Sequence, residues 1–151
     1  MSEFKSINDI LDFAIQNEQK SIDFYTELAK NARTTDMKEV FEQFTKEEIG
    51  HKARLTKIKD EGLFTMPVEK VMDLKISDYV VRIEPKPNMS YEEALVIAMK
   101  REKSAFKLYL ALSDRAPNGE LKHIFLALAM EESKHKLRFE LEYDEFVLKE
   151  N

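Results

Sequence analysis

The chain repeats part of its own sequence, which predicts that its two halves build similar structures. Seven residues of the first half recur in the second half with their type unchanged, all at the offset that separates Glu18 from Glu102. The matching pairs are Glu18/Glu102, Tyr25/Tyr109, Leu28/Leu112, Phe41/Phe125, Glu48/Glu132, His51/His135 and Arg54/Arg138. We expect a duplicated unit whose two copies are related by pseudo-two-fold symmetry and enclose a symmetric site.

Four long segments carry apolar residues at helical spacing, which predicts an all-α fold. We expect helices over about residues 7–33, 36–61, 91–115 and 119–148. The connections within the first pair and within the second pair are short, so each pair should form an antiparallel hairpin. A crossover over about residues 62–90 joins the hairpins. Two hairpins and one long crossover predict a ferritin-like four-helix bundle that occupies residues 1–151 as a single domain.

Residues at the expected helix ends have the chemistry of caps. Ser6 or Asn8 could begin the first helix and Thr35 the second, while Gly62 is placed to end the second helix. Ser90-Tyr91-Glu92-Glu93 has the spacing of a capping box. The crossover carries apolar side chains, so we expect it to pack and to include a short helix or strand: Phe64, Val71, Leu74, Tyr79, Val80 and Ile83.

The apolar stripe of each predicted helix is interrupted at its middle by ionisable residues. Arg33 lies midway between Glu18 and Glu48, Pro117 lies midway between Glu102 and Glu132, and the two intervals are equal. At the rise of an α-helix, all four carboxylates sit roughly 22 Å from the turn of their own hairpin, and thus in one layer. Two imidazoles join them through a Glu-x-x-His spacing, which places both side chains on one helix face: Glu48 with His51, and Glu132 with His135.

Any single one of these glutamates could be exposed or satisfied by hydrogen bonds, but the joint pattern favours a metal site. Four facing carboxylates in a core would repel one another, and burial of each ionised group is costly. Two divalent cations would balance the charge. Carboxylate and imidazole without thiolate suit iron or manganese. We therefore predict a two-metal site, with iron expected and manganese as the alternative, whose ligands are Glu18, Glu48, His51, Glu102, Glu132 and His135.

Two tyrosines and two methionines lie near this layer in the sequence. Tyr25 and Tyr109 follow Glu18 and Glu102 by two helical turns on the same stripe. Each hydroxyl could hydrogen-bond a ligand carboxylate or pass an electron to the site, or each tyrosine could be an ordinary core residue. Met99 and Met130 are expected to fill the core.

The motifs Glu18-x6-Tyr25, Glu48-Ile49-Gly50-His51, Glu102-x6-Tyr109 and Glu132-Ser133-Lys134-His135 resemble the di-iron domain of the rubrerythrin family. The resemblance covers nearly the whole chain. It implies that Glu48 and Glu132 bridge two irons, that Glu18 and Glu102 are terminal ligands, and that one histidine caps each metal. It also implies reduction of hydrogen peroxide to water and a homodimeric assembly.

The chain departs from this family pattern in two respects. Many members carry a rubredoxin-like domain with four cysteines, whereas this sequence has no cysteine, so an external electron-donor protein is expected. Members also often place an extra glutamate one turn after the third-helix ligand. Ala105 stands at that position and Ser21 at the matching position of the first helix. The ligand set is therefore similar to that of bacterioferritin, and oxygen-dependent oxidation of ferrous iron stays open.

Composition narrows the classes of function and partner. The net charge of −5 disfavours a nucleic-acid partner, and no apolar run is long enough to cross a membrane. The N-terminus has no signal-peptide pattern, so a cytoplasmic protein is expected. The preferred function is reduction of hydrogen peroxide or oxygen. The alternatives are ferritin-like iron oxidation, a manganese catalase, a di-iron hydroxylase and a non-enzymatic helical metal-binding module.

Overall fold

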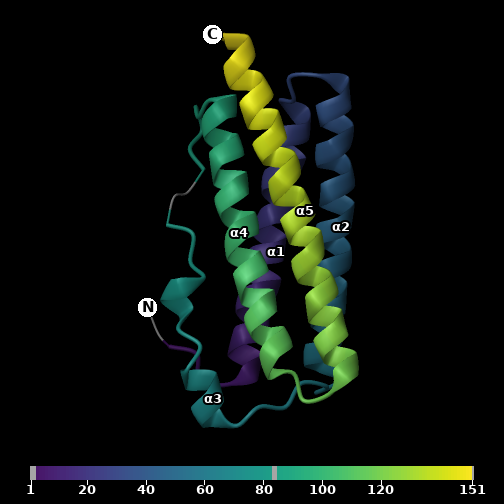
Figure 1. Cartoon of the computed structure of the whole chain (residues 1–151), viewed down its shortest axis with the longest axis vertical. Coiled ribbons are helices and arrows are strands. Elements are labelled where there is room, and N and C mark those ends of the chain that lie inside the picture. The colour runs from purple at the N-terminus through teal and green to yellow at the C-terminus, as the bar shows by residue number, and fades with distance from the viewer. Residues whose placement is uncertain (1–2, 83–84, 151) are drawn as a thin grey trace. The chain divides into compact units, whose positions relative to one another are not determined.

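The structure, a computed structural model, describes residues 3–82 and 85–150, with side chains as far as Leu148, and the described part is helical without strands (Figure 1). The chain divides into two compact units, residues 1–74 and 75–151. The first unit contains α1 (Ile7–Lys30), α2 (Thr35–Asp60) and the short α3 (Val68–Met72). The second contains the 3-10 turn η1 (Ile76–Asp78), α4 (Tyr91–Arg115) and α5 (Gly119–Glu150).

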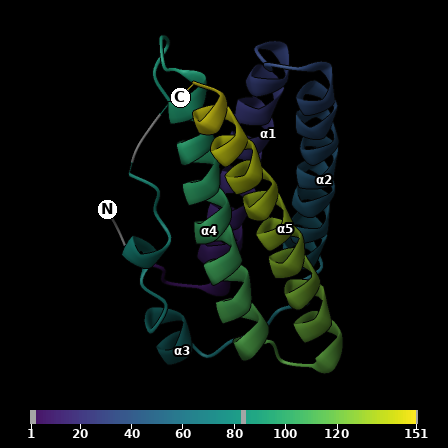
Figure 2. The same cartoon turned by 45° about the horizontal axis from the view of Figure 1, so that its top comes forward.

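In the first unit, α1 and α2 run side by side as an antiparallel hairpin (Figures 1 and 2). The Ser6 hydroxyl caps α1 by accepting from the backbone N–H of Asp9. The helix stops at Lys30, not at the expected Arg33. Asn31 closes it, because its backbone N–H and its side-chain amide both donate to the Glu27 carbonyl. The expected cap Thr35 is also wrong. Thr34 is the cap residue, and its hydroxyl accepts from the N–H of Met37, so α2 begins one residue early.

Gly62 ends α2 in the left-handed conformation, as the sequence predicts, with φ of 62°. Its N–H donates to the Lys59 carbonyl, and the N–H of Leu63 donates to the Ile58 carbonyl. These two bonds form a Schellman motif, which satisfies carbonyls at the end of a helix and requires a left-handed residue. The chain therefore turns away from α2 at a defined point.

In the second unit, α4 and α5 form the other antiparallel hairpin (Figures 1 and 2). Ser90 and Glu93 make the predicted capping box, in which each side chain accepts from the other residue's backbone N–H. Asn118 caps α5 by accepting from the N–H of Leu121. The bounds of α4 are those expected, and α5 continues to Glu150, beyond the expected residue 148.

The repeated apolar residues are core residues in both hairpins. Phe41, Phe125 and Tyr25 are 0 % exposed, and Tyr109 is 1 % exposed. The predicted role of Met130 is wrong, since this side chain is 51 % exposed on α5. Met99 is half-buried.

The crossover contains short helices rather than a strand in its described residues. Phe64, Val71, Leu74 and Tyr79 are buried, and Val80 is half-buried. The Ser104 hydroxyl of α4 donates to the Tyr79 carbonyl and so fixes the crossover to the second unit. Ile83 lies outside the described residues.

Within the described part of the chain, no helix has the length and apolar character that a membrane span requires.

Two glycines of α2 and its end predict stability changes of opposite sign. A Cβ atom added at Gly62 or at Gly50 would meet no atom within 4 Å, so neither substitution to alanine causes a steric clash. Gly62→Ala should destabilise the protein by about 1 kcal/mol because an L side chain is strained at positive φ. Gly50→Ala, in the helix interior, should stabilise it by roughly 0.5–1 kcal/mol. Urea unfolding of the two variants tests this, and a shift in the same direction for both would contradict it.

The capping box of α4 predicts a pH-dependent contribution to stability. The Ser90 backbone N–H and hydroxyl hold the pKa of Glu93 below its ordinary value of 4.5. A lowered folded-state pKa means that the stabilisation is present above the ordinary pKa and is lost as the pH falls through the folded-state pKa. Glu93→Gln should therefore be less stable than the natural chain at neutral pH, and the difference should shrink in acid. Glu120→Gln, which changes an exposed first-turn carboxylate of α5, is the matched control for removing one charge.

Candidate metal centre

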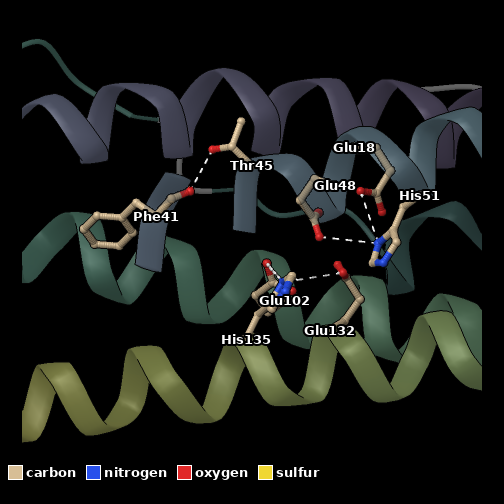
Figure 3. Close-up of polar contacts among 8 residues, drawn as sticks. All are labelled: Glu18, Phe41, Thr45, Glu48, His51, Glu102, Glu132 and His135. Carbon is tan, nitrogen blue, oxygen red and sulfur yellow. Dashed lines mark hydrogen bonds and ion pairs between the residues drawn. The ribbon is translucent and has the colours of Figure 1, made fainter. Parts of the chain in front are cut away.

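The first unit brings three of the predicted ligands together in its interior. Glu18 comes from α1, whereas Glu48 and His51 come from one face of α2 (Figure 3). Their exposed fractions are 2 %, 0 % and 2 %. The Nδ1 atom of His51 lies 3.7 Å from a Glu18 carboxylate oxygen and 3.4 Å from a Glu48 carboxylate oxygen. One ligand atom of each residue lies within 4.8 Å of the others, so the three form a compact triad.

Contacts next to this first triad hold α1 and α2 in register. Gln19 follows Glu18 in sequence, and its side-chain oxygen accepts from the Lys52 ammonium at 2.6 Å, while its amide nitrogen donates to Asp23. Lys52 in turn follows His51. The residues beside the two ligands are thus bonded across the hairpin, which fixes the relative height of Glu18 and His51.

The second unit holds an equivalent triad of Glu102 from α4 and Glu132 and His135 from α5 (Figure 3). Their exposed fractions are 1 %, 1 % and 2 %. The Nδ1 atom of His135 lies 3.5 Å from a Glu102 oxygen and 3.8 Å from a Glu132 oxygen. The repeat predicted from the sequence therefore produces the same buried set of side chains in each unit.

These separations suit residues that share one cation better than residues that bond each other directly. Charge-assisted N–H···O bonds are about 2.7–2.9 Å long, whereas all four separations are 3.4 Å or longer. Ligand atoms about 2.0–2.2 Å from one divalent ion lie roughly 3–3.5 Å apart in tetrahedral or octahedral geometry. The separations of 3.4 and 3.5 Å lie in this range, and those of 3.7 and 3.8 Å are slightly longer. Two carboxylates with one imidazole also suit iron or manganese chemically. Each triad thus fits a metal ion.

The predicted tyrosines are buried in the same hairpins. Tyr25 lies beside Phe24 with ring centroids 6.0 Å apart, and Tyr109 lies beside Phe125 at 6.2 Å. These contacts account for the aromatic rings as core residues. A chemical role for either tyrosine hydroxyl stays a prediction, and so does metal ligation by the six triad residues.

One buried carboxylate was missing from the predicted set. Glu142 of α5 is 2 % exposed and accepts a hydrogen bond from the Tyr91 hydroxyl at 2.9 Å. It lies seven residues after His135 and three after Phe139, so it continues the apolar stripe of α5 by one more step. Extending the stripe past Phe139 would have found it. The tyrosine hydrogen bond gives Glu142 a structural partner away from the triad.

Two helix hairpins, each with a buried pair of carboxylates and an imidazole, define a class of helical metal-carboxylate protein. A family model described as Rubrerythrin matches residues 9–82 and 93–151. The chain belongs to the rubrerythrin family, and this confirms the resemblance and the ferritin-like, all-α fold class. Members of this family are generally di-iron oxidoreductases. Comparison with curated proteins and with solved structures gave no significant match.

Metal binding should stabilise the protein in a way that depends on the triad histidines. A ligand that binds only the folded state adds about 2.7 kcal/mol at a concentration 100 times its dissociation constant. We expect ferrous or manganous ions to raise the urea midpoint of the chelator-treated protein, and His51→Ala or His135→Ala to remove most of that increase. The matched control is His123→Ala, because His123 is the third histidine of the chain and is exposed. An increase that is equal in all variants would contradict ligation by the triads.

Proposed function

We propose that this protein reduces hydrogen peroxide, or oxygen, at a di-iron centre built from both triads, with electrons from an external donor protein. The observation that supports this most is the presence of two equivalent buried triads in a chain of the rubrerythrin family. The equal distance of the four glutamates from their hairpin turns in the sequence supports one shared centre over two separate ones.

In this proposal the triads neutralise and hold two ions. Glu48 and Glu132 would be the ligands common to both ions, Glu18 and Glu102 would each be a ligand of one ion, and His51 and His135 would each supply one imidazole ligand. Four carboxylates balance two divalent cations, which removes the repulsion that four buried negative charges would otherwise produce. When bound, two ferrous ions would supply one electron each, so that one hydrogen peroxide and two protons give two waters.

The surrounding residues would keep the site dry and its geometry fixed. Tyr25, Phe41, Tyr109 and Phe125 are buried in the same hairpins as the carboxylates. A low-dielectric environment strengthens the interaction between the carboxylates and a cation. The tyrosine hydroxyls are the groups proposed to donate hydrogen bonds to carboxylates or to pass electrons. The 151 residues contain no cysteine with which to hold a thiolate-ligated redox centre, and the proposal therefore assigns the reductant to another molecule.

A second candidate function is the oxidation of ferrous iron by oxygen, and the residues one turn after the terminal glutamates favour it. Ser21 is buried at 7 % exposure and Ala105 is half-buried. Neither supplies the extra carboxylate that many family members place there. A centre with six protein ligands is the type found in bacterioferritin, and oxygen would then be the oxidant.

Metal analysis followed by single-turnover kinetics tests the proposal. Protein purified without chelators should contain about two irons per chain. The reduced protein, mixed anaerobically with peroxide, should consume about one peroxide per two irons and react at least about tenfold faster than with oxygen, as expected if peroxide is the substrate. Glu132→Ala should abolish this reaction, whereas Glu120→Gln should not change it.

The other outcomes of this experiment are equally informative. A faster reaction with oxygen than with peroxide would favour the oxidation of ferrous iron. Manganese in place of iron, with peroxide consumed in the absence of a reductant, would indicate a catalase. Absence of metal and of metal uptake would overturn the proposal. Tyr25→Phe and Tyr109→Phe, measured in the same way, would show whether either hydroxyl affects the rate.

A further inference from the structure

An open pocket of about 390 Å³ lies in the second unit, between α4 and the end of the crossover that runs beside it (Figure 1). Val80 and Val81 of the crossover, both half-buried, supply its apolar part. The hydrogen bond from the Ser104 hydroxyl to the Tyr79 carbonyl fixes this part of the crossover to α4, so the pocket has a fixed wall. A pocket of this volume is in the range of binding sites for small molecules.

The charged side chains that line this pocket are mostly cationic. Lys100, Lys103 and Lys107 are exposed and project within roughly 60° of one another around α4. Among the described lining residues, Arg82 is the fourth cation and Asp78 is the one carboxylate, so four positive groups and one negative group give a net charge of +3. None of the four cations forms an ion pair or hydrogen bond through its side chain with another described residue. Their charge is therefore available to a ligand.

The internal repeat shows that the hairpin itself does not require these lysines. Three residues of the first unit correspond to Lys100, Lys103 and Lys107, and they are Gln16, Gln19 and Asp23. Two neutral residues and one acidic residue thus serve in a hairpin of the same design. The cationic cluster belongs to the second unit alone, in a chain whose net charge is −5.

One of the lysines stands where the first unit makes a stabilising contact. Gln19 accepts a hydrogen bond from Lys52 across the hairpin, whereas the corresponding residues of the second unit, Lys103 and Lys136, are both cations and cannot pair. Lys136 bonds Glu140 within its own helix. Like charges three and four residues apart also destabilise a helix. A cluster that lowers stability in both ways needs another reason, and binding of an anion supplies one.

We propose that this pocket binds a small organic diphosphate, with the diphosphate group on the lysines of α4 and the organic part against Val80 and Val81. Lysine ammonium groups bind phosphate as point charges. Lys100 and Lys107 are separated by about 10 Å of helix rise with Lys103 between them, which is room for two linked phosphates. One phosphate ester carries a charge of about −1.5 to −2 and would leave the lining partly unbalanced, whereas two linked phosphates balance it.

The pocket is separate from the candidate metal centre. Glu102 precedes Lys103 on α4, but Glu102 is 1 % exposed and Lys103 is exposed. The pocket therefore opens on the side of α4 that points away from the triad. Substitutions in the pocket should leave the metal content unchanged, and the binding of a diphosphate can be measured whether or not the protein reduces peroxide.

Isothermal titration calorimetry of the full chain tests the proposal, with inorganic pyrophosphate, adenosine diphosphate and dimethylallyl diphosphate as the probes. Pyrophosphate should bind with a dissociation constant below about 1 mM. At least one organic probe should bind at least about fivefold more tightly, because its organic part covers the valines. Val81→Ser should remove this preference without changing the affinity for pyrophosphate.

Lysine variants locate the binding. Lys103→Gln, which introduces the residue found in the first unit, and Lys107→Gln should each weaken the binding of all three probes about tenfold. Lys122→Gln removes an exposed lysine of α5 outside the pocket and should bind as the natural chain does. Urea unfolding separates loss of binding from loss of the fold, because Lys103→Gln should be at least as stable as the natural chain.

Three results would contradict the proposal. Absence of binding of all three probes at about 1 mM would overturn it. Equal affinity in the two pocket variants and in Lys122→Gln would also overturn it, because the probes would then bind elsewhere. Equal affinity for pyrophosphate and for both organic probes would overturn the organic part and identify inorganic diphosphate as the ligand.

Discussion

An ionised carboxylate loses much of its hydration when it leaves water, and each hairpin of this chain holds two carboxylates at 2 % exposure or less beside a single imidazole. A cation shared by such a cluster would offset this loss, provided that the members are held at a spacing that the cation can occupy. The height of α1 against α2 is therefore not free to vary. A bond between Lys52 and Gln19, immediately beside His51 and Glu18, holds that height in the first unit. The Schellman end at Gly62 and the Thr34 cap define where α2 stops and starts.

The same constraint explains where the internal repeat is strict and where it is not. All three triad positions are identical in the two units, and so are the tyrosine and the phenylalanine that are buried with them. Farther from the triads the units differ. Glu142 and the Tyr91 hydroxyl form a partly buried hydrogen bond in the second unit, whereas the corresponding positions of the first unit are Ile58 and Ile7. A hydrogen-bonded polar pair and a pair of apolar residues can both satisfy a core position. A residue that served as a metal ligand, as predicted for the triads, would have no such substitute.

Helical period, caps and the repeat were enough to predict the number and type of long helices and the six residues of the triads. These signals predicted the exact helix ends less well, because several neighbouring residues there have side chains that can make the capping hydrogen bond. Asn31 ends α1 early by donating to Glu27, and Thr34 rather than its neighbour Thr35 caps α2. Thr34 and Thr35 both have the chemistry of a helix cap, and only the path of the turn selects between them. Metal ligation requires side chains from different helices to meet at one ion. The family match supports ligation by the triads, and a metal-binding measurement is its test.

The role of Met130 could not be predicted from its residue type because α5 is apolar on two sides. One stripe runs through Leu121, Phe125, Leu128, Glu132, His135 and Phe139. A second, exposed stripe runs through Met130, Leu137, Leu141 and Leu148, two residues out of step with the first and about 200° away around the helix. Both stripes have the coiled-coil period, so the residue type of a methionine does not assign it to one stripe or the other. A surface helix needs only one such stripe. When the core of the hairpin covers one of two such stripes, the other is left exposed, and Met130 lies on the exposed one.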